Sequence, residues 1–265
     1  MKTPHISVIT ATRNVEQTLP ALYDSLLKQS SENFEWVVAD AQSNDGTVGL
    51  LRKFSHESSW VRYISEPDFG LYHAINKGLA IAQGQYYVVA GADDVFARDA
   101  LLNYERAVSQ SNADVILARV RRGGRVIGGF HPNKSWVGHS KVFAGSHSLG
   151  MLFRRALHLR FGYYSPRFPL LADGYFLKNL LASNSVEFMD ADFISGRFAE
   201  GGVTTVSKLQ ILAETWQIQM MTEPLPALQM ILFIGKLIVR YPAIARELLR
   251  AKKAKIAHTL TSERD

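Results

Sequence analysis

The sequence contains no cysteine among its 265 residues. A disulfide framework and a thiolate metal site are therefore both excluded, and the absence fits a reducing compartment. The first residues, MKTPHISVITATRN, also lack the long apolar segment and the small-residue cleavage site of a secretory signal. We therefore expect a cytoplasmic location.

Glycine is missing from the turn that follows the first strand-like segment. That turn reads TATRNVEQ, residues 10–17. A nicotinamide or flavin dinucleotide site needs a glycine-rich turn here, because glycine lets the backbone approach a pyrophosphate closely. The GxxxxGK[ST] pattern of a P-loop is absent from the whole chain. The absence of these two glycine-containing motifs argues against a dinucleotide-dependent oxidoreductase and against a P-loop NTPase.

Short runs of β-branched and aromatic residues predict four buried strands, separated by helical segments with short links. The strands are expected at residues 5–12, 34–41, 61–67 and 86–90. This alternation is typical of βαβ units, which form a mostly parallel sheet covered by helices on both faces. With 47% hydrophobic and 20% charged residues, the chain has the composition of a globular α/β protein with a full core.

Capping residues mark the expected ends of the helices. Asn14 and Asp45 are expected to cap the first and second helices, because their short side chains accept hydrogen bonds from first-turn N–H groups. The third helix is expected at residues 70–84, with Gly84 at its C′ position. A β-hairpin is predicted to turn at Gly123-Gly124.

Acidic residues follow three of these strands at the point where each strand ends. Asp40 ends the second strand, Asp68 follows the third, and Asp93 and Asp94 follow the fourth. Ligands of open parallel sheets bind beyond the carboxyl ends of the strands. Two adjacent aspartates repel each other, and a divalent cation is the usual counter-charge. The alternative is that Asp93 and Asp94 only cap the next helix and lie in water.

Six blocks of sequence together resemble one family. In chain order they read ISVITATRN, WVVADAQSNDGT, EPDFGLYHAINKGLAIAQGQYYVVAGADD, HSLGMLFRR, LLADGYFLKNLL and FAEGGVT. Their order and spacing resemble the family-2 glycosyltransferases of the GT-A fold, especially bacterial members of the exopolysaccharide and colanic-acid type. The resemblance covers about residues 4–206. It implies a GT-A, Rossmann-like α/β fold with a mostly parallel central sheet flanked by helices.

The resemblance also implies an activity: inverting, metal-assisted transfer of a sugar, of the hexosyltransferase type, from a nucleotide diphosphate sugar to a saccharide acceptor hydroxyl. It implies Asp173 as catalytic base, although Asp173 also suits the N-cap of a helix, and Asp93 as the acid that holds Mn²⁺ or Mg²⁺ on the diphosphate. Donor binding is implied for Thr10, Ala11 and Arg13 in the loop that cups the nucleotide, for Asp40 and Asp68 at the base and ribose, and for Lys77 and Asp94.

Acceptor-side roles are expected for His147, which precedes SLGMLFRR, and for Arg197. A lone histidine is also a common structural residue, and Arg154 in the same block has the same two interpretations. Arg197 and the glycines at 200–203 form either a loop near the diphosphate or an ordinary turn.

The sequence departs from the family's DxD-type motif, because Gly91 stands where the first acid is expected. His73 also stands where many relatives carry Asp or Asn. A protein that binds a nucleotide sugar without turning it over is therefore one alternative. A sugar-nucleotidyltransferase is another, but such enzymes need a glycine-rich basic loop after the first strand, which TATRNVEQ does not supply.

The sequence changes character after about residue 206, so we expect a GT-A domain at 1–206 and an apolar and basic helical extension at 207–265. A helix of about 13 residues at 227–239 spans only about 20 Å, too short for a hydrocarbon core of about 30 Å. Seven Lys or Arg residues lie within 236–256. We expect either an in-plane helix on an anionic inner-membrane surface, which would suit a lipid-linked acceptor, or a helix packed on the catalytic domain. We expect no nucleic-acid partner.

Overall fold

The computed structural model describes residues 5–138, 142, 147–198 and 208–262, with side chains described as far as residue 246. The chain divides into two compact units, Met1–Gly202 and Val203–Asp265. This boundary lies close to the predicted one after residue 206, and the two-domain organisation stays a prediction.

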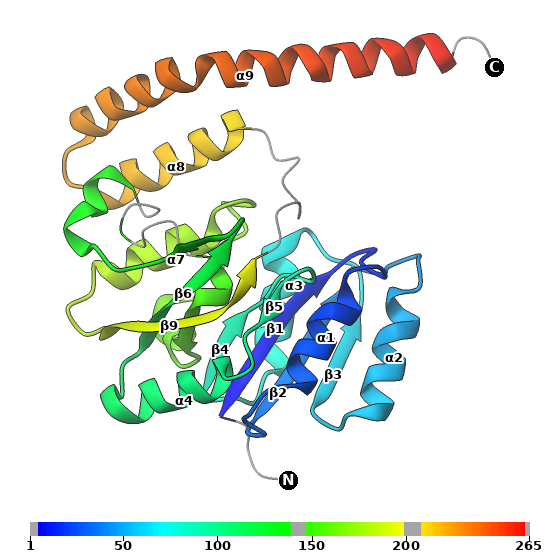
Figure 1. The fold of residues 1–265 in the computed structure, drawn as a ribbon. Coiled ribbons are helices and arrows are strands. Elements are labelled where there is room, and N and C mark those ends of the chain that lie inside the picture. The colour runs from blue at the N-terminus through cyan, green and yellow to red at the C-terminus, as the bar shows by residue number, and fades with distance from the viewer. Residues whose placement is uncertain (1–4, 139–141, 143–146, 199–207, 263–265) are drawn as a thin grey trace. The chain divides into compact units, whose positions relative to one another are not determined.

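The first unit is built on a nine-stranded sheet, counted over the described residues (Figure 1). Four parallel strands lie side by side in the order β3-β2-β1-β4. They are β1 (Ile6–Thr12), β2 (Phe34–Asp40), β3 (Val61–Ser65) and β4 (Tyr86–Val89). The four predicted strands and their parallel arrangement are therefore confirmed.

The other half of the sheet is mixed. Its strands are β5 (Val95–Phe96), β6 (Val115–Arg122), β7 (Arg125–Ile127), β8 (Met151–Arg154) and β9 (Phe188–Phe198). β8 lies antiparallel between β4 and β6, and β9 continues from β6 to β5. The predicted hairpin is confirmed: β6 and β7 pair antiparallel, and both turn glycines, Gly123 and Gly124, have positive φ.

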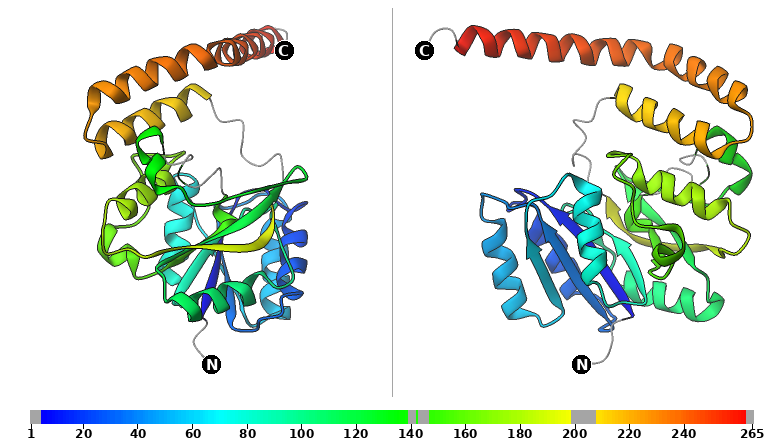
Figure 2. Two further views of the ribbon diagram at one scale, coloured as in Figure 1. Left: turned by 60° about the vertical axis from the view of Figure 1, so that its left-hand side comes forward. Right: turned by 180° about the vertical axis from the view of Figure 1, so that it is seen from behind.

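Helices cover both faces of the sheet (Figures 1 and 2). Their bounds are α1 (Leu19–Leu27), α2 (Thr47–Glu57), α3 (Leu71–Ile81), α4 (Ala100–Ser111), α6 (Leu157–Phe161) and α7 (Ala172–Leu181). Two 3₁₀ helices, η1 (Pro132–Val137) and η2 (Ser148–Gly150), precede β8. α1, α2 and α4 pack with Val8 and Trp36 in one apolar core, whereas α3 packs on the other face.

The first helix begins later than the sequence predicts. Asn14 has φ of 54° and does not cap α1, which starts at Leu19. Its amide oxygen instead accepts a hydrogen bond from Asn44 N–H, which joins the loops that follow β1 and β2. Asp45 lies one residue before Gly46, the N-cap of α2, so it is not the cap residue that the sequence predicts. Its carboxylate nevertheless accepts a hydrogen bond from the N–H of Thr47, the first residue of α2.

Gly84 serves a different purpose from the predicted one. α3 ends at Ile81 and continues into extended backbone at Ala82, so Gly84 is not its C′ residue. A Cβ at position 84 would lie 2.5 Å from the hydroxyl of Ser7 and 2.6 Å from its backbone nitrogen. Glycine is required here because the chain passes directly against β1.

The second unit contains two helices, α8 (Lys208–Thr222) and α9 (Pro226–Ser262), joined by a short connection. The two helices pack against each other: the rings of Trp216 and Phe233 lie 5.1 Å apart between centroids. The predicted helical character of the extension is confirmed.

Candidate active site

The carboxyl ends of the four parallel strands meet at one edge of the sheet. Asp40 is the last residue of β2, Asp68 follows β3, and Asp93 follows β4. β8 runs antiparallel to β4, with Val88 opposite Leu152, so the segment that enters β8 lies at this same edge. The topology therefore brings His147 to the edge at which the acidic residues gather.

Asp173 lies in the first turn of α7, where it is half-buried. Its Oδ1 accepts a hydrogen bond of 2.5 Å from the hydroxyl of Tyr72 and one of 2.7 Å from the N–H of Gly174. Among the described residues, Oδ2 receives no hydrogen bond. One carboxylate oxygen is thus held in place, and the other is available to a ligand. The alternative prediction, that Asp173 is the N-cap of this helix, is wrong, because Leu171 occupies the N-cap position and Asp173 lies inside the first turn.

Tyr72 is the site residue that sequence reasoning missed. It lies near the start of α3, and its position on an apolar helical face made it look like a core residue. Burial and the neighbouring charge of Asp173 raise the pKa of the Tyr72 hydroxyl well above its usual value, so it remains a donor. A buried tyrosine hydroxyl needs a polar partner, and this requirement was the available signal.

His147 lies beside Asp94, with 3.7 Å between its Nδ1 and Asp94 Oδ2, and is half-buried. Its ring packs on Phe198 with centroids 4.0 Å apart, and its Nδ1 accepts a hydrogen bond from Leu149 N–H. Burial lowers the pKa of His147 to about 4, against the opposing effect of Asp173 and with that of Arg122. The imidazole is therefore neutral at physiological pH, with its proton on Nε2.

Asp93 and Asp94 converge around Gly91. A Cβ at position 91 would lie 2.9 Å from Asp93 Oδ1 and 3.3 Å from Asp94 Oδ2. Asp94 is fully buried and accepts a hydrogen bond from Gly91 N–H, whereas Asp93 is half-buried. A side chain at position 91 would push the Asp93 carboxylate aside and lie in tight contact with that of Asp94.

The carboxylates near Gly91 would bind a divalent cation only together with oxygen ligands from a substrate. Among the described residues, no group of three or more His, Asp or Glu side chains is arranged to hold a metal ion. Mg²⁺ is nevertheless commonly bound by one or two carboxylates together with substrate phosphates. The role of Asp93 as such a ligand stays a prediction.

The carboxylate of Asp40 is hydrogen-bonded to other residues of the protein. The strand register sets Thr12, Asp40 and Ser65 side by side across β1, β2 and β3. The Asp40 carboxylate, 2% exposed, accepts four hydrogen bonds: from the hydroxyls of Thr12, Ser43 and Ser65 and from Ser43 N–H. Asp40 thus organises the loops at this edge, and its contact with a nucleobase stays a prediction.

The residues predicted for the nucleotide loop differ in position. Thr10 and Ala11 belong to β1, not to the loop after it, so their predicted location is wrong. Thr10 is fully buried, and its hydroxyl accepts a hydrogen bond from the indole N–H of Trp36. Arg13 does lie in the loop, is exposed, and forms no hydrogen bond or ion pair with a described residue.

Asp68 and Lys77 shape the segment between β3 and α3. Asp68 Oδ1 accepts a hydrogen bond from Gly70 N–H at the start of the helix. Lys77 Nζ donates to Glu66 Oε2 at 2.9 Å and to Pro67 O at 2.7 Å. Both side chains therefore stabilise the loop at the sheet edge, and their contacts with a donor stay predictions.

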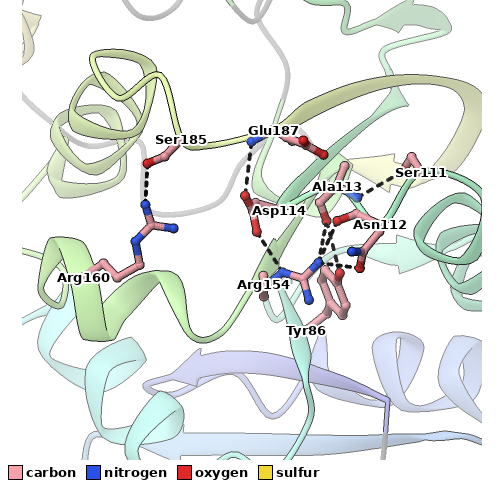
Figure 3. A network of polar contacts seen from close by, with 9 residues as sticks. All are labelled: Tyr86, Ser111, Asn112, Ala113, Asp114, Arg154, Arg160, Ser185 and Glu187. Carbon is pink, nitrogen blue, oxygen red and sulfur yellow. Dashed lines mark hydrogen bonds and ion pairs between the residues drawn. The ribbon is translucent and has the colours of Figure 1, made fainter.

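Neither Arg197 nor Arg154 forms a hydrogen bond or ion pair with Asp173 in the part of the chain that the structure describes. Arg197 pairs with Val95 across β9 and β5 and lines a surface hollow between α1 and β5. The glycines at 200–203 lie outside the described residues. Arg154 ends β8 at the opposite sheet edge, where it donates to Asp114 and Asn112 and stacks over Tyr86 (Figure 3). Arg154 is therefore a structural residue.

The fold is that of the GT-A glycosyltransferases. It superimposes on S. aureus TarS in complex with UDP-GlcNAc with a TM-score of 0.66 at 19% identity, covering 90% of this chain and 73% of that one. The mannosyltransferase PcManGT of Pyrobaculum calidifontis, in complex with GDP-Man and Mn²⁺, gives a TM-score of 0.62 at 18% identity, covering 96% and 80%.

The chain belongs to glycosyl transferase family 2, whose model matches residues 7–167. It is 30% identical over 183 residues to the PGL/p-HBAD biosynthesis glycosyltransferase of Mycobacterium bovis, covering 65% of this chain and 68% of that protein. It is 29% identical over 115 residues to the cholesterol galactosyltransferase of Borreliella burgdorferi, covering 43% and 32%. The protein is thus a glycosyltransferase, as the resemblance implied, and the sugar-nucleotidyltransferase alternative has no support.

Proposed function

We propose that the protein transfers a sugar from a nucleotide diphosphate sugar to an acceptor hydroxyl, with inversion at the anomeric carbon. The observation that carries the proposal is the arrangement of Asp173. One of its oxygens is held by Tyr72 and by Gly174 N–H, and the other carries no hydrogen bond from a described residue. A carboxylate in this state is suited to accept the proton of an incoming hydroxyl.

Inversion needs the acceptor oxygen to attack on the face of the sugar opposite to the departing diphosphate. The bond between the anomeric carbon and the diphosphate oxygen breaks as the new glycosidic bond forms. Asp173 takes the proton of the acceptor hydroxyl, and the electron pair of the broken bond leaves with the nucleoside diphosphate. Neutral His147 keeps additional positive charge away from the acceptor side of the site at physiological pH.

The departing diphosphate carries negative charge that the site must balance. A divalent cation, when bound, neutralises this charge as a Lewis acid. Asp93 would hold the cation, with Asp94 beside it, and the exposed Arg13, which follows β1, would pair with a phosphate. The bound Mn²⁺ of the Pyrobaculum neighbour supports this assignment.

Replacement of the base tests the proposal directly. In Asp173→Asn the side chain keeps its shape but accepts no proton, so transfer is expected to fall by about 10²–10⁴-fold. Donor binding, measured by calorimetry, should stay near the wild-type value. Asp24→Asn, at an exposed carboxylate on α1, is the matched control and should leave transfer unchanged.

Substantial transfer by Asp173→Asn would remove Asp173 from the mechanism. A wild-type protein that binds a nucleotide sugar but neither transfers nor hydrolyses it, with every acceptor fraction tried, would instead favour the binding-only alternative that Gly91 raised.

The donor is best identified by thermal shift. We propose a nucleotide sugar donor because solved neighbours of this fold hold UDP-GlcNAc and GDP-Man. UDP-, GDP- and dTDP-sugars are compared, each with Mn²⁺ or Mg²⁺. The true donor should raise the Tm most, since a ligand that binds only the folded state stabilises it.

We propose an acceptor in bacterial surface-polysaccharide assembly, at the cytoplasmic face of the membrane. The resemblance of the sequence blocks to enzymes of exopolysaccharide synthesis supports this assignment. Two relatives are named for PGL/p-HBAD biosynthesis and for a sterol acceptor, so an acceptor with a lipid part also fits. Transfer assays with lipid-linked and free saccharide fractions distinguish the two.

A further inference from the structure

The two helices of the C-terminal unit bury polar side chains between them. Gln219 of α8 and Gln229 of α9 are 2% and 3% exposed, and the amide of Gln219 donates to Gln229 Oε1 at 3.3 Å. Lys236, two turns further along α9, is only partly exposed and lies beside Trp216 and Gln219. The side of α9 that faces α8 therefore carries Gln229 and Lys236 beside the apolar Leu232 and Phe233.

The other side of α9 is apolar and exposed. Ile231, Ile234 and Ile238 follow one another at helical spacing and are 67%, 48% and 68% exposed. Val239 and Tyr241 beside them are 80% and 66% exposed. Residues three and four positions apart lie on one helix face, so Ile231, Ile234, Ile238 and Tyr241 form a continuous stripe, and Val239 flanks it. We call these five residues the apolar stripe.

The exposed side of α9 differs from that of a helix that faces water. A surface helix normally buries its apolar stripe and presents polar residues to solvent. In α9 Gln229 and Lys236 lie against α8 and the isoleucines point away from it. An exposed apolar surface rimmed by polar residues marks a site at which a protein contacts a membrane or another protein.

The charge of the same helix indicates which of these partners the apolar stripe contacts. Arg240 and Arg246 are exposed at the end of the stripe. The sequence then continues with Arg250, Lys252 and further basic residues, and Glu247 is the one acid of residues 236–256. Basic residues beside an apolar helix face are attracted to anionic lipid headgroups.

The structure corrects the length argument made from the sequence. Pro226–Arg246, a stretch of 21 residues within α9, is long and apolar enough to cross a membrane, and only 11% of its most apolar window is buried. A crossing helix would place Lys236, its middle residue, at the centre of the bilayer, where an ammonium group is costly. An in-plane helix instead keeps Lys236 on the side of α8, away from lipid.

We propose that the apolar stripe of α9 docks in-plane on an anionic phospholipid surface, with the basic residues that follow it contacting the lipid headgroups. The stripe inserts into the boundary between headgroups and acyl chains, and the arginines remain at the level of the phosphates. This docking depends on neither donor nor acceptor, so its test is independent of the proposed transferase activity.

Vesicle flotation with the full-length protein tests the proposal. The protein is expected to float with vesicles of phosphatidylcholine and phosphatidylglycerol, and to float poorly with phosphatidylcholine alone. Raising the salt from about 0.1 M to about 1 M shortens the Debye length from about 10 Å to about 3 Å, so binding should weaken markedly. Failure to bind anionic vesicles even at low salt overturns the proposal.

The stripe itself is tested with a double variant and a matched control. Ile231→Glu with Ile238→Glu places two charges in the stripe and is expected to reduce vesicle affinity at least about tenfold. Leu159→Glu with Val126→Glu adds the same charge at two exposed apolar positions of the first unit, 85% and 51% exposed, and should bind like wild type. Circular dichroism and Tm establish that both variants fold.

The other occupants of the stripe give different results. If two copies of the chain cover it, sedimentation shows a dimer that the stripe variant loses while vesicle binding is absent. If α9 crosses the bilayer, membranes from expressing cells release the protein only with detergent and not with high salt. Either result overturns in-plane docking, as does equal vesicle binding by the two double variants.

Discussion

The hydroxyl of Tyr72 is the group that fixes the orientation of Asp173. It donates a hydrogen bond of 2.5 Å to Asp173 Oδ1, and its raised pKa keeps it protonated. In Tyr72→Phe the ring and its packing remain but one of the two donors to Asp173 Oδ1 is lost, so the carboxylate is held by Gly174 N–H alone. We expect transfer to fall about tenfold to a hundredfold, with donor affinity nearly unchanged, in separate measurements of kcat and donor Kd.

The matched control for that prediction is Tyr164→Phe. The Tyr164 hydroxyl lies 2.9 Å from that of Tyr87, in the interior, and makes no hydrogen bond to Asp173. Its loss should lower the free energy of unfolding by about 1–3 kcal/mol while kcat stays near wild type. If the two variants lose kcat equally, Tyr72 acts only through stability.

His158 determines part of the acid stability of the protein. Its Nδ1 donates to Gly162 O at 2.9 Å, so Nε2 of the neutral ring accepts the hydrogen bond from Tyr87 OH. Burial lowers the pKa of His158 below its usual value of 6.5. The unfolded chain therefore binds a proton at a higher pH than the folded one, and stability falls as the pH drops below about 6.5.

The measurement is urea unfolding of wild type and His158→Gln across pH 5–8. The free energy of unfolding should be determined to within about 0.5 kcal/mol at each pH. The variant should be less stable at neutral pH, and its stability should decline less steeply on the acid side. A variant with the wild-type acid slope would mean that His158 is protonated in the folded state.

At the scale of elements, α3 lies directly on β1 because of one glycine. A Cβ at Gly78 would lie 2.8 Å from Cγ2 of Ile9, which is fully buried and cannot move aside. Gly78→Ala gains about 1 kcal/mol of helix propensity but overpacks the interface at a cost of about 1–3 kcal/mol. We expect a net loss of up to about 2 kcal/mol in urea unfolding.

Gly49 of α2 provides the matched helix control. A Cβ at position 49 meets nothing within 4 Å. Gly49→Ala should therefore raise the free energy of unfolding by about 0.5–1 kcal/mol. Stabilisation by both alanines would show that α3 moves away from β1 without cost.

The elements also show which signals the sequence carried. β1 to β4 were predictable because continuous runs of β-branched and aromatic residues mark strands buried on both faces. β9 was not predicted, since its sequence FMDADFISGRF mixes acidic and apolar residues and much of the strand is partly exposed. The loop after β1 was misjudged because the role of Asn14 depends on a partner, Asn44, in another loop.

At the scale of the whole molecule, the first unit holds its own apolar core. The main cluster of buried side chains runs from Ile6 to Ala191, within Met1–Gly202. A chain that ends at Gly202 should therefore unfold cooperatively, with Tm within about 4 °C of the full-length protein, and should keep donor binding. It should also lose binding to anionic vesicles.

Differential scanning calorimetry and flotation check this prediction together. A truncated chain that lacks a cooperative transition would show that the second unit completes the fold of the first. A truncated chain that still floats with vesicles would place the lipid contact outside α9.

The sequence by itself determined the parallel half of the sheet and the positions of Asp40, Asp68 and Asp93 at strand ends, because these depend on periodicity over a few neighbouring residues. Only the tertiary structure decided the contacts between distant segments. Tyr72 and Asp173 are 101 residues apart, and antiparallel β8 delivers His147 to the same edge. Such pairs depend on the packing of the entire sheet with its helices, which no local pattern contains.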